Sequence, residues 1–186
     1  YRRRVEEAAK RLGYQVNSYA RGLKTNRTCS AALILPNVTD PFFAMLAQEV
    51  CSALAQRGSR TILSTTAYNR SAEQRCIQMV QQNKVDGIIG LTYTPDLDVD
   101  PRLPYVSIDR YFSPCVPCVS SDNFGGGQLA AKKLLDLGCS RPLFLRIGSK
   151  VPGESDKRGD GFESVCRQRG IDCTSLRLCD EEGYAP

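Results

Sequence analysis

Short apolar runs alternate with stretches of helical periodicity along most of this chain. Residues 31–35 form a continuous apolar run, which is typical of a strand buried on both faces of a sheet. Asp40 followed by Pro41 is a typical helix start, because the carboxylate caps the first turn and proline fits its first position. Apolar residues then recur at helical spacing until Gly58, where we expect the helix to end.

The same alternation continues along the sequence and predicts an α/β fold. The predicted strands are residues 61–65, 85–91, 105–108, 143–147 and 175–178, and the predicted helices between them are residues 71–83, 124–137 and 156–169. Ser71 and Gln74 have the spacing of a capping box, so we expect the helix over 71–83 to be capped there. Strands that alternate with helices of this length form right-handed crossovers and a parallel, doubly wound sheet.

Two short helical patterns precede the first strand. Apolar residues recur at i, i+3, i+4 and i+7 from Val5 to Leu12, so one face of this segment is apolar. Gly13 stands where a helix commonly ends. Asn17 can cap a second, very short helix over residues 17–23.

The net charge of +5 is located on these N-terminal segments. Residues 1–27 hold eight basic and two acidic side chains, so the remaining residues are close to neutral overall. A basic segment on a neutral body suits contacts with nucleic-acid phosphates, although terminal charge runs are usually only solvated. No apolar run of about 18 residues occurs, and no apolar stretch follows the basic N-terminus, so we expect neither a membrane span nor a secretory signal.

Nine cysteines are scattered along the sequence, and their odd number argues against a disulfide framework. Cys115 and Cys118 have the CxxC spacing of a redox or zinc motif. They lie in a proline-rich loop of a chain that has no histidine and no second CxxC, so two reduced thiols are the favoured interpretation. Reduced cysteines fit a cytoplasmic protein.

The N-terminal pattern resembles the end of the DNA-binding headpiece and the hinge helix of LacI-type regulators, the lactose-repressor and galactose-repressor family. That family reads R-V-x-x-A-A-x-x-L-G-Y-x-P-N-x-x-A-R-x-L, and this chain matches it from Arg4 to Leu23 except at the proline, where it has Val16. The rest resembles the periplasmic-binding-protein-like effector domain of the same family. The markers are Leu35-Pro36-Asn37, Asp40-Pro41-Phe42-Phe43, Val85-Asp86-Gly87-Ile88-Ile89, Asp122-Asn123-Phe124-Gly125-Gly126-Gly127, Leu137-Gly138 and Arg158-Gly159-Asp160-Gly161-Phe162.

The resemblance covers essentially the whole chain and implies three parts. Residues 1–27 would be the end of the DNA-binding headpiece and the hinge helix, residues 28–112 the N-terminal effector subdomain, and residues 113–186 the start of the C-terminal effector subdomain. Members of the family run to nearly twice this length. We therefore expect a chain truncated at both ends, without the helix-turn-helix and with an incomplete second subdomain.

Ligands of open α/β sheets bind at the carboxyl ends of the strands, where the topology switches. The residues that follow predicted strands, and are therefore candidates for effector binding, are Asp40, Phe42, Phe43, Asn69, Tyr93, Asp109 and its neighbour Arg110. The resemblance implies that aromatic rings at Phe42 and Phe43 stack on a sugar or base ring. Because neighbouring residues on a helix do not share a face, we expect only one of the two to point into the cleft.

Two further candidates come from the second subdomain. Arg158 matches a family arginine that holds a polar group of the effector, and Glu154 falls at a position that usually carries a small hydroxyl residue. We expect Arg158 to face the phenylalanines across the cleft. The alternative role for Arg158 is a surface ion pair with Asp156 or Asp160.

The resemblance also implies DNA contacts from Asn17, Ala20, Arg21 and Leu23, with the leucine wedged between base steps in the minor groove. We therefore expect a ligand-responsive transcriptional regulator of the repressor type, which binds operator DNA and a small effector such as a sugar or sugar derivative. A solute-binding protein of the same fold is the alternative. It would need a secretory signal and would not need the hinge sequence.

A homodimer is expected, because the family uses the first effector-domain helix, here residues 42–56, at its subunit interface. Cys51, Leu54 and Ala55 widen the apolar surface of that helix beyond one core face. An enzyme is disfavoured, since a chain without histidine cannot form a Ser-His-Asp triad and no P-loop is present. We therefore expect no cofactor and no metal, and we interpret the glycines at 125–127 as helix-packing positions.

Residues 17–23 are too few to form a stable helix alone in water, so we expect this segment to become helical only on operator DNA. In the complete protein, Leu23→Ala should lower operator affinity and leave effector affinity unchanged, because the wedge touches only DNA. Fluorescence anisotropy with operator DNA and calorimetry with the effector measure the two affinities. Unchanged operator affinity in the variant would contradict the wedge.

Overall fold

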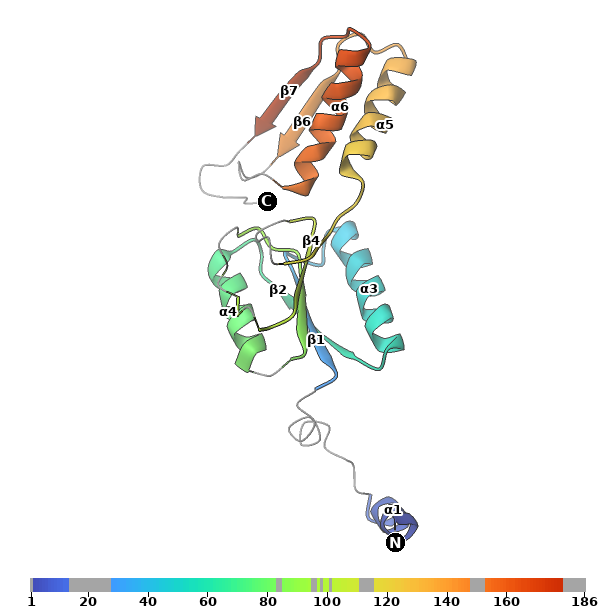
Figure 1. Ribbon diagram of the computed structural model, residues 1–186, viewed down its shortest axis with the longest axis vertical. Coiled ribbons are helices and arrows are strands. Elements are labelled where there is room, and N and C mark those ends of the chain that lie inside the picture. The colour runs from blue at the N-terminus through green and yellow to red at the C-terminus, as the bar shows by residue number, and fades with distance from the viewer. Residues whose placement is uncertain are drawn as a thin grey trace.

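The computed structural model describes residues 2–13, 28–82, 85–94, 97, 99–100, 102–110, 116–147 and 153–178. In these ranges the chain forms an N-terminal helix, α1 (Arg2–Arg11), and two α/β subdomains that follow it (Figure 1). Helix α1 was predicted, and Gly13 has the positive φ of +63° expected after a helix end. The predicted helix over 17–23 lies outside the described residues.

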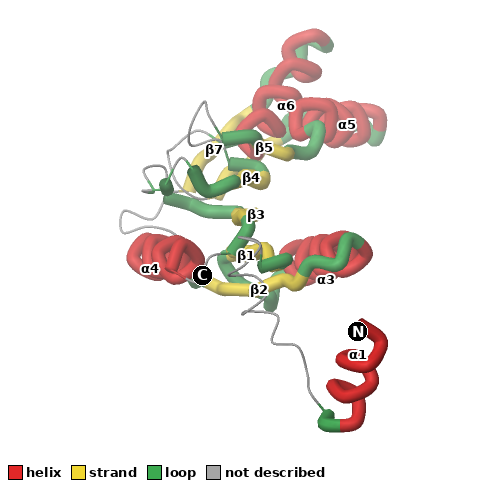
Figure 2. Tube along the Cα trace, turned by 60° about the horizontal axis from the view of Figure 1, so that its bottom comes forward, coloured by secondary structure: helices red, strands yellow, loops and turns green. Residues whose placement is uncertain are grey.

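The first subdomain is built on a five-stranded parallel sheet with the strand order β2-β1-β3-β4-β5. Its strands are β1 (Ser30–Leu35), β2 (Arg60–Thr65), β3 (Gly87–Gly90), β4 (Tyr105–Ile108) and β5 (Cys118–Val119). Helices α3 (Pro41–Gln56) and α4 (Arg70–Gln82) lie on opposite faces of this sheet (Figure 2). The predicted parallel, doubly wound arrangement is confirmed.

Strand β1 lies at the centre of the hydrophobic core. Ala32, Leu33, Ile34 and Leu35 are all fully buried, because α3 covers one face of the strand and α4 the other. The continuous apolar run in the sequence is therefore explained by burial on both faces. The loop after residue 35 therefore leaves the sheet from the fully buried end of this strand.

The second subdomain contains β6 (Leu143–Ile147), β7 (Thr174–Leu178), α5 (Asn123–Asp136) and α6 (Lys157–Gln168), and a 3-10 turn (Glu154–Asp156) precedes α6. Strands β6 and β7 form a parallel pair with the two helices on one side (Figure 1). Leucines on the strands remain about half exposed: Leu143, Leu145, Leu176 and Leu178. Within the described residues, one face of this small sheet is therefore open.

Helices α5 and α6 approach each other closely because glycines face backbone at the contact. A Cβ atom at Gly127 would collide with the carbonyl oxygen of Arg158, and one at Gly161 would collide with that of Phe124. The glycines at 125–127 thus include a packing residue, as predicted. Side chains at these two positions would force the helices apart.

Two details of the first subdomain differ from the prediction. Helix α4 begins at Arg70, and the side chain of Asn69 accepts a hydrogen bond from the Ala72 amide at 2.9 Å, so the predicted capping box at Ser71 is wrong. Asn69 caps the helix because it stands directly before the first helical residue, where its oxygen can reach a free amide.

Strand β5 was not predicted, since two residues are too short for a periodic pattern. It pairs with β4, with Ile108 opposite Val119, so the first sheet extends beyond residue 112, where we expected the second subdomain to begin. Cys118 lies in this strand, and Cys115 lies outside the described residues. No helix in the described part of the chain is long and apolar enough to cross a membrane.

The contact between α5 and α6 gives a prediction with an internal control. Gly127→Ala should destabilise the protein by about 1–3 kcal/mol, because the added methyl group has no room beside the Arg158 carbonyl. Gly126→Ala, where a Cβ meets nothing within 4 Å, should stabilise it by roughly 0.5–1 kcal/mol through higher helix propensity. Urea unfolding of both variants measures the difference, and equal effects would contradict the tight contact.

Candidate functional site

A cleft of about 360 Å³ lies at the carboxyl edge of the first sheet, where it meets the second subdomain. The lining residues are Asp40, Phe42, Phe43, Leu91, Tyr93, Asp109, Arg110, Ser155 and Arg158. They come from the start of α3, from the segments after β3 and β4, and from the beginning of α6 with the turn before it. Seven of the nine residues predicted for effector binding thus line one cavity, at the strand ends that the topology favours.

Two phenylalanines at the start of α3 supply aromatic surface to the cleft. Asp40 caps the helix by accepting a hydrogen bond from the Phe42 amide at 2.8 Å, which fixes the first turn. Phe42 is 50% exposed, whereas Phe43 is 5% exposed and belongs to the core on the α3 side. The rings meet edge to face with centroids 5.5 Å apart.

We expected only one of the two rings to face the cleft, and Phe42 is the half-exposed one, whereas Phe43 is a buried core residue whose ring still borders the cavity. Helical geometry does separate them by about 100°. Phe43 nevertheless reaches the cavity because it lies at the end of the helix, where the core itself forms the floor of the cleft. The Phe43 ring therefore packs in the core and also lines the cleft.

Tyr93 is held between two partners. Its ring makes an edge-to-face contact with Tyr68, with centroids 5.0 Å apart, and the guanidinium of Arg110 lies 4.3 Å from the Tyr93 centroid. Such cation–π contacts place a positive group against the aromatic face. Asn37 donates a hydrogen bond to the Tyr68 hydroxyl at 3.2 Å, so the loops after three strands are joined at this point.

Arg158 reaches the cleft from α6 and is anchored to the loop after β4 through one intermediate. Its Nε donates a hydrogen bond of 2.6 Å to Oδ1 of Asn123, and Nδ2 of Asn123 lies 3.4 Å from Oδ1 of Asp109. Within the described residues, no carboxylate forms an ion pair with Arg158. Asp156 and Asp160, the alternative partners, pair with Arg146 instead, at 3.7 and 3.4 Å.

The backbone at this edge of the sheet adopts conformations that ordinary residues rarely take. Ala67, Tyr68 and Asp109 have positive φ angles of 47°, 59° and 51°. Each such residue costs on the order of 1–3 kcal/mol, and such strain is concentrated at binding sites. Asp109 is buried, and its amide donates a hydrogen bond to Val119 O at 3.0 Å, which keeps the turn in place.

Two candidate residues do not line the cleft. Asn69 caps α4 with its side-chain oxygen. Glu154 pairs with Lys157 at 2.7 Å and accepts a longer hydrogen bond of 3.4 Å from Ser120. Asn17, Ala20, Arg21 and Leu23, the residues predicted to contact DNA, lie outside the described residues.

Three residues of the site were missed from the sequence. Leu91 is the residue directly after β3, Ser155 precedes Arg158 by one helical turn, and Asn123 carries the link between Asp109 and Arg158. A turn-based search from Arg158 would have found Ser155. Asn123 had no such signal, because its role depends on the packing of the two subdomains.

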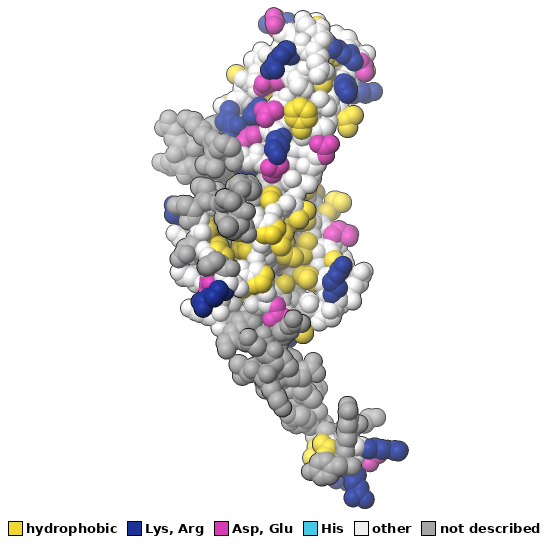
Figure 3. Space-filling view, viewed as in Figure 1, with side chains coloured by type: hydrophobic (Ala, Val, Ile, Leu, Met, Phe, Trp, Pro, Cys, Tyr) yellow, Lys and Arg dark blue, Asp and Glu magenta, His cyan; other side chains and the backbone are white. Residues whose placement is uncertain are grey.

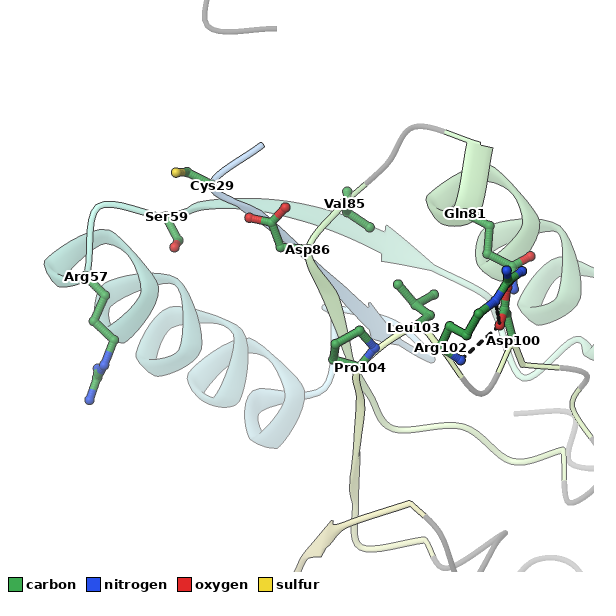
Figure 4. Close-up of a pocket in the computed structure, with 10 residues that line it drawn as sticks. All are labelled: Cys29, Arg57, Ser59, Gln81, Val85, Asp86, Asp100, Arg102, Leu103 and Pro104. Carbon is green, nitrogen blue, oxygen red and sulfur yellow. Dashed lines mark hydrogen bonds and ion pairs between the residues drawn. The ribbon is translucent and has the colours of Figure 1, made fainter. Parts of the chain in front are cut away.

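A larger cavity, of about 890 Å³, lies at the opposite, amino edge of the first sheet (Figure 4). Arg57 lies at one end and Arg102 at the other, with Asp86 between them (Figure 4). Arg102 is engaged by Asp100 at 2.8 Å, and this contact lowers the pKa of Asp100 to about 2. The charged groups of this cavity do not converge on one point, in contrast to those of the cleft. No acidic or thiol cluster suited to a metal occurs among the residues described.

Comparison with known proteins identifies the family. Residues 28–183 match the family model described as periplasmic binding proteins and sugar binding domain of LacI family. The chain belongs to this family. Within the LacI family, it is similar to the sucrose operon repressor of Streptococcus mutans, with 33% identity over 90% of this chain and 53% of that protein. It is also similar to the ribose operon repressor of Halalkalibacterium halodurans, with 31% identity over 90% of this chain and 51% of that protein.

Solved structures agree on the fold. A LacI-type regulator from Alkaliphilus metalliredigens, crystallised with D-xylulofuranose, has a TM-score of 0.74 and 23% identity over 80% of this chain and 56% of that one. A ribose operon repressor protein from Lactobacillus acidophilus has a TM-score of 0.72 and 19% identity over 83% of this chain and 59% of that one. The chain spans about half the length of the curated relatives that it matches.

Proposed function

We propose that this chain carries the effector-binding core of a sugar-responsive transcriptional repressor. The observation that supports this most directly is the cleft, in which aromatic rings, carboxylates and guanidinium groups from both subdomains meet. Aromatic faces bind the apolar faces of sugar rings, and charged groups bind their hydroxyls. The relatives named as sucrose and ribose operon repressors point to the same ligand class.

The effector acts by changing the equilibrium between arrangements of the two subdomains. A ligand that touches Phe42 on one side and Arg158 on the other stabilises the closed arrangement by its contacts with both. A change in operator affinity then follows from linkage, since the two binding events share one conformational equilibrium. Operator DNA is contacted by the basic segment over residues 1–27, which places the protein with the chromosome in the cytoplasm.

We also propose that the cleft binds its ligand without catalysing a reaction. The chain contains no histidine, and the acidic residues of the cleft are used structurally, with Asp40 capping α3 and Asp109 accepting from Asn123. A solute-binding protein of the same fold is the second candidate, because the matching family also includes periplasmic binding proteins. The basic α1 segment favours the repressor.

We also propose that the protein is a homodimer through the face of the first subdomain that carries α3. Hydrophobic side chains gather over the middle of this subdomain (Figure 3). Met45 on α3 is 70% exposed, and Val119 on the edge strand β5 is largely exposed as well. A twofold interface is self-complementary, so these residues would meet their own copies or close neighbours.

Arg158→Ala in the complete protein tests the effector site. The variant should bind its sugar roughly tenfold to hundredfold more weakly, because a charged hydrogen-bonding group contributes about 1.5–3 kcal/mol. Operator affinity without sugar should be unchanged. Arg167→Ala, on the exposed side of the same helix, is the matched control and should bind normally. Calorimetry with sucrose and D-ribose measures both, and wild-type affinity in Arg158→Ala would exclude Arg158 from the site.

The dimer proposal can be tested with the two methionines of the chain. Met45 is exposed on α3, and Met79, 40% exposed, lies on α4 across the sheet. Met45→Asp should weaken the dimer at least tenfold, because it buries an unpaired carboxylate in the interface. Met79→Asp should leave the dimer intact. Analytical ultracentrifugation of both variants gives the dissociation constants, and a dimer that tolerates Met45→Asp would refute this interface.

A further inference from the structure

Glu73, on α4, is a carboxylate buried completely beneath the effector cleft, with an exposed fraction of 0%. Its Oε1 accepts a hydrogen bond from the Tyr93 amide at 3.0 Å, and its Oε2 accepts one from the Thr94 amide at 3.2 Å. No basic side chain pairs with it within the described part of the chain. Both acceptors are thus directed to two consecutive amides of the segment that follows β3.

The two hydrogen bonds to Glu73 satisfy backbone amides that would otherwise lack an acceptor. The Leu91 amide still donates to Ile34 O in β1 at 2.9 Å. The segment then leaves the sheet while Thr92 and Thr94 remain buried, so the amides beyond Leu91 need an acceptor other than water. Buried amides without partners are costly, and a charged acceptor makes stronger hydrogen bonds than a neutral one. Glu73 therefore fixes the path of a buried loop that has no strand partner at this point.

That path determines where the Tyr93 ring lies. Tyr93 lines the cleft and is flanked by Tyr68 and by the Arg110 guanidinium. A shift of the Tyr93 backbone would move its ring and loosen the support for Arg110. Packing of α4 on the sheet does not need Glu73, because Ile77 and Val80 already fill that contact, and Asn69 caps the helix.

We propose that Glu73 is a positioning residue for the effector site, which holds Tyr93 and through it Arg110 in the conformation that binds sugar. This inference rests on the proposed function, since it assigns Glu73 to the same cleft. It adds a group that lies outside the cleft, reaches it only through the backbone, and belongs to the α4 side of the sheet. Its effect on affinity should therefore depend on Tyr93.

Amide hydrogen exchange tests the contact without any ligand. In the wild-type protein, the Tyr93 and Thr94 amides should exchange slowly although they lie outside a strand. In Glu73→Gln, one acceptor becomes an NH2 group that opposes an amide, so both should exchange on the order of tenfold faster. The Ile88 amide, which donates to Pro104 O at 2.8 Å within the sheet, should not change. Equal acceleration at Ile88 would indicate general destabilisation and overturn the proposal.

A double-mutant cycle tests the effect on binding, with sucrose and D-ribose as the probes. Glu73→Gln should weaken binding on the order of tenfold, and this loss should largely vanish in a Tyr93→Ala background but persist in a Phe42→Ala background. Glu7→Gln, the same exchange at an exposed position on α1, is the control and should bind as wild type. A loss of the same size in all backgrounds would overturn the proposal.

The effector site and the role of Glu73 can be refuted separately. If Tyr93→Ala and Arg158→Ala both leave sugar binding unchanged, the cleft is not the effector site, and the exchange rates alone decide the role of Glu73. If those variants lose affinity and Glu73→Gln does not, the cleft stands and the positioning role is refuted. Glu73→Asp keeps the charge but has a shorter side chain, so it should show the same faster exchange at Tyr93 and Thr94. This variant replaces Glu73→Gln in both experiments if Glu73→Gln folds poorly.

Discussion

The whole site depends on how backbone amides find hydrogen-bond acceptors where parallel strands end. A strand in the sheet has hydrogen-bonding partners on both sides, but the loop that leaves it has none, and each buried amide then needs another acceptor. Glu73 supplies it to the Tyr93 and Thr94 amides, and short polar side chains supply acceptors to the more exposed amides of the neighbouring loops. Asn37 accepts from the Thr39 and Asp40 amides at 3.1 and 3.0 Å, and Asn69 accepts from the Ala72 amide. Side chains of the loops themselves therefore replace the missing strand partners.

These local hydrogen bonds hold the cleft-lining residues of each subdomain in place. The Asp40 cap orients the first turn of α3 and therefore Phe42, and Asp109, with its positive φ, lies where the chain leaves β4. The positive φ at Asp109 carries a cost in backbone strain, which the packing of β1 and its helices offsets. The link from Asp109 through Asn123 to Arg158 then joins the two halves.

The sequence predicted the regular elements well because burial leaves a periodic trace. Strand β1 is an unbroken apolar run since both faces are covered, and the glycines after α1, α3, α5 and α6 mark their ends. Prediction from the sequence failed where a single contact decides the local structure. Ser71 and Asn69 are both good cap residues, and in the folded chain it is Asn69 that accepts a hydrogen bond from the Ala72 amide. Asn123 and β5 depend on tertiary packing, which no local pattern records.

The glycine contacts between α5 and α6 also limit how this molecule can move. Two helices whose backbones touch, with no side chain between them at Gly127 and Gly161, cannot slide without a backbone clash. Arg158 is therefore carried on a stiff block, with its position fixed relative to α5 and to Asn123 at the start of that helix. Any opening of the cleft must be absorbed where the chain crosses between the subdomains. The second subdomain then swings as a lever, and a small rotation at the crossing becomes a large displacement at its far end.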